Sequence, residues 1–69
     1  MSNMKVKING KNRNIDAGMT LEDLLQDLDI TPETVVVELN GRIVKGNSFA
    51  SELVQADAVI EILRFVGGG

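Results

Sequence analysis

The chain has 69 residues, with ten acidic and seven basic side chains, a net charge of −3, and neither cysteine nor histidine. These counts exclude disulfides, thiolate or imidazole nucleophiles and nearly all structural zinc sites, and the acidic balance argues against binding to a nucleic-acid backbone. Because apolar runs reach only three residues, as at 35–37, we expect one small cytoplasmic domain that binds neither nucleic acid nor membrane.

The amino-terminal residues predict a β-hairpin. Residues 5–9 alternate between polar and apolar side chains, which is the period of a half-buried strand. Asn9 and Gly10 both tolerate a positive φ, so they predict a tight turn into a weaker edge strand near Ile15. Residues 1–3 precede the pattern, and we expect them to be disordered or vector-derived.

The next segment predicts the main helix. Thr20 is a favourable N-cap residue, and Asp23 stands three residues later, in the position of a capping box. Four leucines recur at the spacing of one helix face: Leu21, Leu24, Leu25 and Leu28. We therefore expect an amphipathic helix of about nine or ten residues.

The rest of the chain predicts three strands and two short helical turns. Pro32 begins the first turn, and the Asn40-Gly41 pair predicts a second hairpin. We expect strands at 35–39, 42–44 and 59–66, and one helical turn over 48–53 with Phe49 and Leu53 directed inward.

This order of elements predicts an α+β protein with a β-grasp fold over residues 1–66, in which one main helix packs on one face of a mixed sheet of four to five strands. Counting with the period of two gives the residues on each face. The helix side receives Val6, Ile8, Val35, Val37, Leu39, Ile60 and Ile62. The opposite face receives Val36, Val44, Val59, Leu63 and Phe65, beside Glu38 and Glu61, and we expect its apolar side chains to dock partners.

The chain ends in Gly67, Gly68 and Gly69, which we expect to form a flexible tail. Residues 65–69 would reach about 16–18 Å when extended, far enough to enter a narrow channel of another protein. Gly67 and Gly68 would allow passage where a Cβ atom would clash, and Gly69 would present an unshielded carboxylate. ATP can convert such a carboxylate into an acyl-adenylate, which a sulfur or nitrogen nucleophile attacks.

Two segments resemble the ThiS family, the sulfur carriers of thiamine thiazole synthesis: Val-Val-Glu-Leu-Asn-Gly-Arg-Ile-Val at 36–44 and Ile-Glu-Ile-Leu-Arg-Phe-Val-Gly-Gly-Gly at 60–69. The resemblance extends through 5–9 and 21–28. It implies a ubiquitin-like β-grasp fold and a carrier that binds no cofactor and is not itself an enzyme. We expect the carrier to be a monomer.

The resemblance also implies the partners. A ThiF-type activating enzyme would use ATP to adenylate the carboxylate of Gly69. Sulfur drawn from cysteine by a desulfurase would then give a thiocarboxylate, and a ThiG-type thiazole synthase would receive that sulfur.

The chain departs from the family pattern in two places. Asp57-Ala58 stands where many members have Gly-Asp, and Lys45-Gly46 stands where many have Pro-Arg. Because Asp tolerates a left-handed φ, we expect the first of these turns to survive.

Three alternatives to the thiazole carrier stay open. A MoaD-like small subunit of molybdopterin synthase shares the fold and the tail, although it is usually longer and has prolines before the terminal glycines. Another thiocarboxylate carrier would serve tRNA thiolation or amino-acid synthesis. A ubiquitin-like binding module would never be activated.

Overall fold

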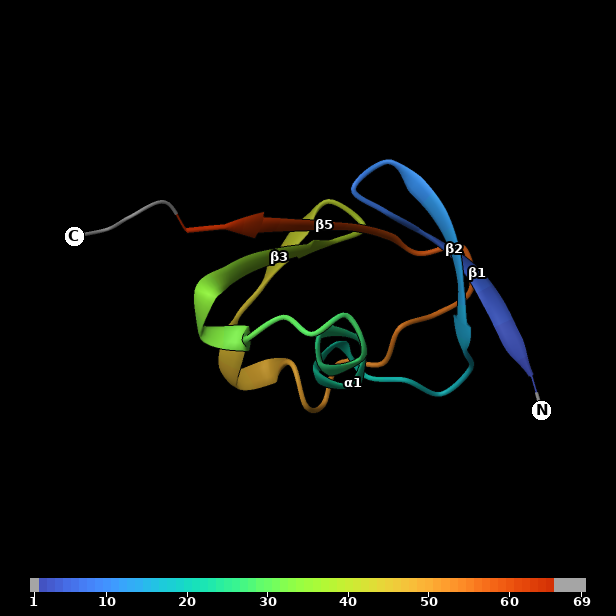
Figure 1. Cartoon of the computed structure of the whole chain (residues 1–69), viewed down its shortest axis with the longest axis horizontal. Helices are drawn as coiled ribbons and strands as arrows, with labels where there is room; N and C mark the ends of the chain where they lie inside the picture. The colour runs from blue at the N-terminus through green and yellow to red at the C-terminus, as the bar shows by residue number, and fades with distance from the viewer. Residues whose placement is uncertain (1, 66–69) are drawn as a thin grey trace.

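The structure is a computed structural model that describes residues 2–65, in which the strands form one mixed sheet. The strands are β1 (Asn3–Ile8), β2 (Lys11–Asp16), β3 (Val35–Leu39), β4 (Arg42–Val44) and β5 (Val59–Arg64), in the spatial order β2-β1-β5-β3-β4. β1 and β5 are parallel, and the other neighbours are antiparallel. One helix, α1 (Leu21–Asp27), lies on one side of the sheet (Figure 1). The predicted α+β architecture, with a mixed sheet and one main helix, is confirmed.

Both predicted hairpins form around two-residue turns. Asn9 and Gly10 have φ values of 50° and 83°, and Asn40 and Gly41 have values of 52° and 87°. Positive φ at both central residues is typical of a type I′ turn, whose twist matches that of the strands it connects. An Asn-Gly pair meets this requirement at little steric cost.

β1 begins earlier than its alternating pattern predicts. Asn3 is already part of the strand and is paired with Asp16, and the Ala17 amide donates to the carbonyl oxygen of Ser2 at 3.1 Å. The expectation that residues 1–3 are disordered is therefore wrong for Ser2 and Asn3. Met1 lies outside the described residues.

The capping box predicted for α1 is present. The Asp23 amide donates to Oγ1 of Thr20, and the Thr20 amide donates to Oδ2 of Asp23, both at 3.1 Å. The helix has seven residues, fewer than predicted, because Leu28 already serves as its C-cap and Asp29 adopts a left-handed φ of 61°. No helix within residues 2–65 is long and apolar enough to cross a membrane.

The loop that follows β4 completes the start of α1. The Leu21 amide donates to the Glu52 carbonyl oxygen at 2.9 Å, and the Glu22 amide donates to the Phe49 carbonyl oxygen at 3.1 Å. Together with the Thr20 side chain, these carbonyl groups satisfy amide donors of the first turn, which have no acceptor inside the helix.

The core lies between the sheet and α1. Among residues 2–65, its buried side chains are Val6, Ile8, Ile15, Leu21, Leu24, Leu25, Val35, Val37, Leu39, Val44, Phe49, Val54, Ala58 and Ile60. Ile62 is partly buried against this cluster, so the predicted helix side of the sheet is confirmed.

The segment between β4 and β5 differs in part from its prediction. Its short helix is the 3₁₀ turn η2 (Gly46–Ser48), and Phe49 is buried as expected. The inward placement of Leu53 is wrong, because 51% of its surface is exposed and Val54 is buried instead. The Val54 amide donates to the Met19 carbonyl oxygen, and neighbouring residues of such an extended segment face opposite sides.

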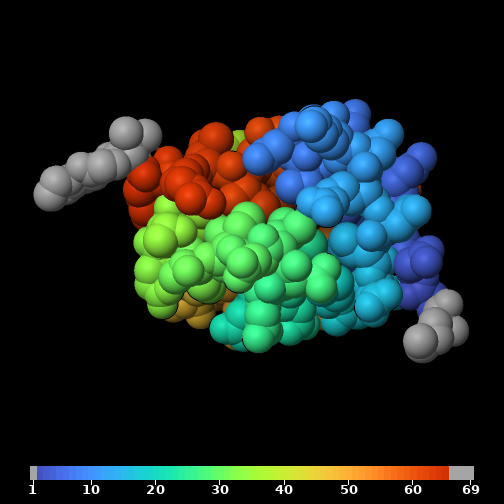
Figure 2. All heavy atoms as spheres, in the orientation of Figure 1, coloured from blue at the N-terminus to red at the C-terminus, as the bar shows by residue number. Residues whose placement is uncertain are grey.

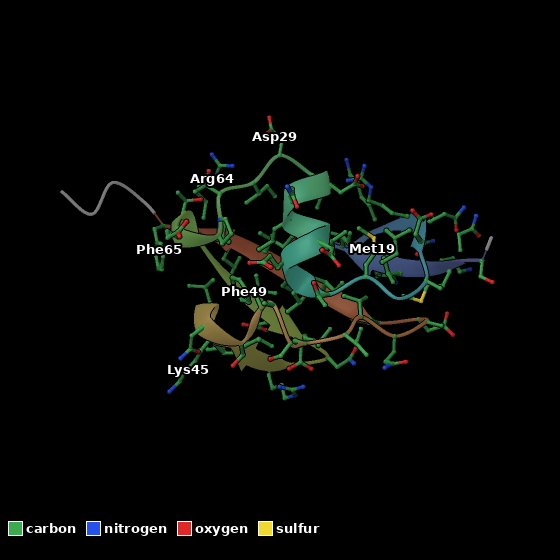
Figure 3. All side chains as sticks on the ribbon, turned by 90° about the horizontal axis from the view of Figure 1, so that it is seen from below. Met19, Asp29, Lys45, Phe49, Arg64 and Phe65 are labelled. Carbon is green, nitrogen blue, oxygen red and sulfur yellow. The ribbon has the colours of Figure 1, made fainter. Side chains whose placement is uncertain are left out.

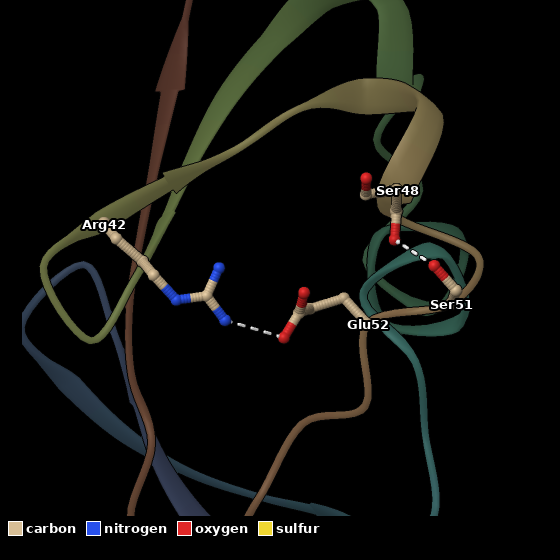
Figure 4. Close-up of polar contacts among 4 residues, drawn as sticks. All are labelled: Arg42, Ser48, Ser51 and Glu52. Carbon is tan, nitrogen blue, oxygen red and sulfur yellow. Dashed lines mark hydrogen bonds and ion pairs between the residues drawn. The ribbon is translucent and has the colours of Figure 1, made fainter.

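One ion pair ties β4 to this segment. Nη2 of Arg42 lies 2.9 Å from Oε2 of Glu52, and the Ser51 hydroxyl donates to the Ser48 carbonyl oxygen at 3.2 Å (Figure 4). Because the Arg42 side chain is 62% exposed, we expect the pair to contribute at most about 1 kcal/mol.

Candidate docking face and carboxyl tail

The tail follows the central strand of the sheet. β5 has β1 on one edge and β3 on the other, and its arrow in Figure 1 points away from the end of the molecule at which β1 begins. The chain therefore approaches its carboxyl terminus from a strand that is held on both edges. The predicted sulfur-carrying residue Gly69 and the predicted passage residues Gly67 and Gly68 lie outside the described residues.

The side chain of Asn9 extends the pairing of β1 with β5. Its Oδ1 accepts from the Ile62 amide at 2.7 Å, and its Nδ2 donates to the Ile62 carbonyl oxygen at 3.2 Å. The Asn9 amide itself donates to the Ile60 carbonyl oxygen at 2.9 Å. The side chain thus continues the ladder by one step after the backbone of β1 has turned away.

Asn40 holds the other edge of β5 at its beginning. Oδ1 of Asn40 accepts from the Val59 amide at 2.9 Å, and the Asn40 amide donates to the Val59 carbonyl oxygen at 2.8 Å. Sequence reasoning treated both asparagines as turn residues alone. The signal for the second role is the side-chain amide, which offers a donor and an acceptor as a peptide group does.

The predicted docking face is exposed at the carboxyl end of β5. Val36 is half-buried and is paired directly with Leu63, which is 51% exposed. Phe65 follows the strand with 59% of its surface exposed, at the end of the molecule toward which β5 runs (Figure 3). We call Val36, Leu63 and Phe65 the tail-proximal apolar cluster.

Val44 does not belong to this face, which corrects the prediction. It is only 4% exposed, lies in the core and is paired with the buried Val37. The exposed residue is Ile43, at 64%, opposite Glu38. A two-residue turn pairs the residues that flank it, here 39 with 42, so odd positions face even positions across the hairpin. Counting by parity without this shift misplaced Val44 and missed Ile43.

Val59 is exposed but stands apart from the cluster. It is 43% exposed and is paired with Lys7 of β1. Leu63 lies four positions farther along the strand, or about 13 Å away at the usual rise. Glu61 lies between them in the alternation.

Two carboxylates border the cluster. Glu38 and Glu61 are directly opposite each other in the pairing of β3 with β5. Like charges in this position destabilise a sheet. Within residues 2–65 the ion pair that forms is that of Arg42 with Glu52, so neither carboxylate is neutralised by a close cation. The face therefore complements a partner surface that is apolar with a basic border.

The two departures from the ThiS pattern leave the fold intact. Asp57 adopts the left-handed conformation with a φ of 64°, as predicted, and its amide donates to the Lys5 carbonyl oxygen at 2.7 Å. Ala58 is buried at 2% exposure. Lys45 precedes η2, and Gly46 begins it. Within the described part of the chain, no group of three or more metal-ligating side chains comes together.

Comparison with known proteins gives concordant matches. A model of the ThiS family matches residues 6–69. A solved structure of the thiamine biosynthesis protein ThiS from Geobacter metallireducens superposes with a TM-score of 0.82 at 33% identity, covering 96% of this chain and 100% of that one.

Two curated relatives are thiazole synthases. The one from Magnetococcus marinus is 42% identical over 66 residues and the one from Paramagnetospirillum magneticum is 44% identical over 66 residues. Each match covers 96% of this chain but 20% of the relative, so the chain spans about a fifth of the length of these synthases. The family match over nearly all residues and the shared fold agree: the chain belongs to the ThiS family.

Proposed function

We propose that this chain is a sulfur carrier protein of thiamine biosynthesis and that Gly69 carries the sulfur. The observation that supports this most strongly is the ThiS family match, which extends through residue 69 and so includes the three terminal glycines. The fold supports it as well, because the tail follows a strand that is anchored on both edges.

The proposed chemistry uses the terminal carboxylate. In the active site of a ThiF-type enzyme, a carboxylate oxygen attacks the α-phosphorus of ATP, which gives an acyl-adenylate and releases pyrophosphate. A sulfur nucleophile then attacks the acyl carbon and displaces AMP, leaving a thiocarboxylate. If the donor is a persulfide formed from cysteine by a desulfurase, a thiol must also supply two electrons to release the sulfur. ATP thus belongs to the partner, and the carrier needs no cofactor.

The tail-proximal apolar cluster is the surface on which we propose that the activating enzyme docks. Leu63 and Phe65 lie next to the tail, so an enzyme bound there has the tail within reach. Apolar side chains in a docking patch supply affinity, and Glu38 and Glu61 at its border would orient a basic partner.

A thiazole synthase is the proposed acceptor of the sulfur. In two relatives of that name, the segment similar to this chain belongs to the same polypeptide as a remainder about four times longer, from the 20% coverage. Covalent linkage holds a donor and an acceptor at high effective concentration. A carrier and a thiazole synthase that cooperate as separate chains would explain why the carrier segment is found both as its own chain and joined to a synthase.

Intact-mass spectrometry tests the proposal. The chain is incubated with ATP, a ThiF-type enzyme, a desulfurase, cysteine and a thiol reductant. Exchange of one oxygen for sulfur changes the mass by nearly as much as oxidation of one of the three methionines, so the shift must be localised to the carboxyl-terminal peptide. We expect a mass shift that is localised to the carboxyl-terminal peptide. Treatment with a thiol alkylator should then add the mass of the alkyl group to the shifted peptide and leave the unshifted peptide unchanged.

A chain with one alanine added after Gly69 is the matched control, and it should stay unmodified. The ThiS protein of Geobacter metallireducens serves as the positive control for the enzymes. If that protein is charged and the tail of this chain is not, the carrier function is wrong and a binding module without activation is favoured. If the chain is charged but a thiazole synthase does not accept the sulfur, the carrier serves molybdopterin synthesis or another acceptor.

A further inference from the structure

A groove lies on the helix side of the sheet, beyond the carboxyl end of α1. It has a volume of about 710 Å³ and is bounded by the β1–β2 hairpin, the end of β5 and the segment after the helix. These three parts of the chain meet on the face shown in Figure 2, where the blue hairpin, the red strand and the green segment adjoin. The tail-proximal apolar cluster lies on the other face of the sheet.

The floor of the groove is apolar. Ile8 and Val35 are each 6% exposed, and Ile62 is partly buried. Leu28 and Ile30 form the wall next to the helix. A segment lying in the groove would therefore remove apolar surface from water along its length.

The charge of the groove is opposite to that of the whole molecule. Lys11, Arg13 and Arg64 all line it, and none of the described residues that line it is acidic. These are three of the seven basic residues in a chain whose net charge is −3. Lys11 is paired with Ile8, and Arg13 with Val6, so both basic residues share the face of buried positions and lie on the groove side.

Within residues 2–65, the edge of β5 at Arg64 has no backbone partner where it borders this groove. Phe65 donates from its amide to the Thr34 carbonyl oxygen, so the alternation of an antiparallel ladder directs the backbone of Arg64 away from β3. On that side the pairing with β1 ends at Ile60. The amide and carbonyl groups of Ile62 are hydrogen-bonded to the Asn9 side chain. Among the described residues, no hydrogen bond is formed by the Arg64 backbone on this edge. An unpaired strand edge is a template for an extended peptide.

We propose that this groove binds an extended acidic segment of a partner protein. The segment pairs with β5 at Arg64, and its alternate carboxylates, on the groove side of the sheet, lie against Lys11, Arg13 and Arg64. An extended peptide satisfies all three features together: length, negative charge and backbone groups that complete the open edge. A small anion would use the charge alone.

Titration of the ¹⁵N-labelled full chain with a synthetic peptide tests this site by NMR. The probe is the capped sequence Asp-Val-Glu-Val-Asp-Val, compared with Asn-Val-Gln-Val-Asn-Val. We expect the acidic peptide to shift the amides of Lys11, Asn12 and Arg64, with an affinity that falls as salt is raised, and the neutral peptide to bind at least about tenfold more weakly.

Two double variants distinguish binding in the groove from attraction by the net charge of the chain. Lys11→Glu with Arg13→Glu reverses two charges in the groove, and Lys5→Glu with Lys7→Glu reverses two on the adjacent strand but off the groove. We expect the first pair to weaken binding at least about tenfold and the second to change it by less than about threefold. All four side chains are exposed, and dispersed amide spectra verify that each variant folds.

Four results would overturn the proposal. Equal losses in both double variants would show that net charge alone attracts the peptide. Shifts confined to the opposite face, or no shifts at any peptide concentration, would show that the groove is not the site. Inorganic pyrophosphate that shifts the same amides at concentrations as low as the peptide requires would identify a small-anion site. None of these results depends on whether Gly69 is charged with sulfur.

Discussion

At the scale of single residues, Asn9 and Asn40 each perform two tasks. Each accepts the left-handed backbone that its turn requires, with φ values of 50° and 52°, and each uses its side-chain amide to bond β5. Glycine would satisfy only the first task, and aspartate at position 9 would keep the acceptor of the second but not its donor, whereas asparagine satisfies both. The turns at the two Asn-Gly pairs thus also fix the strand that leads to the tail.

Replacement of Asn9 should weaken β5 locally. Asn9→Gly keeps the turn conformation and removes both side-chain bonds to Ile62, so we expect the free energy of unfolding to fall by about 1–2 kcal/mol. The Ile62 amide should lose most of its protection in hydrogen exchange. Asn9→Asp keeps the acceptor and should have an intermediate effect. Unchanged protection of Ile62 in Asn9→Gly would contradict the role of the Asn9 side chain in holding β5.

At the scale of elements, α1 is short and depends on its ends and its buried face. Seven residues are too few for a stable helix in isolation, so packing of Leu21, Leu24 and Leu25, all fully buried, must supply most of its stability. The capping box adds two bonds at the start. The loop carbonyls of Phe49 and Glu52 complete the first turn, although they are far away in the sequence.

Thr20→Ala should lower the free energy of unfolding by about 1 kcal/mol, because the Asp23 amide loses its acceptor. Thr20→Ser, which keeps the hydroxyl, should stay within a few tenths. Thr31→Ala is the matched control, since Thr31 caps η1 (Pro32–Thr34) without a side-chain hydrogen bond. Urea denaturation of the three variants measures the difference, and equal losses at the two threonines would refute the capping role.

The elements show which features a sequence reveals. The leucine spacing and the Asn-Gly turns are local signals, and they predicted α1 and both hairpins. The position of Val44 depends on how the second hairpin pairs its strands, and the exposure of Leu53 depends on a bridge to Thr20. The groove was not predicted at all, because it gathers Lys11 and Arg64 from distant parts of the chain. Contacts of this kind leave no mark in a local pattern.

At the scale of the whole molecule, the sheet separates a buried side from a docking side, and adjacent residues of β4 test that division. Val44→Thr places a hydroxyl in the core and should cost about 1–3 kcal/mol. Ile43→Thr changes a side chain that is 64% exposed and should stay within about 0.5 kcal/mol. Thermal or chemical denaturation measures both. Similar losses at the two positions would contradict the assigned faces.

Substitutions on the exposed face of the sheet should weaken partner binding without affecting folding. We expect Leu63→Ser to lower the rate of adenylation by the activating enzyme at least about tenfold, since central apolar contacts dominate an interface. Val59→Ser, outside the tail-proximal apolar cluster, should lower it by less than about threefold. Both positions are exposed, at 51% and 43%, so neither change should unfold the chain. Equal effects would show that docking does not centre on the cluster.

The position of β5 also determines how the molecule withstands mechanical force. Tension applied through the carboxyl end of β5 acts along a strand with neighbours on both edges, so the hydrogen bonds that lie across its axis are sheared together. An edge strand would instead be peeled away one bond at a time. An unfolding motor that pulls on this end would meet its greatest resistance at the first step, and the end proposed to carry the sulfur is therefore a poor handle for dismantling the domain.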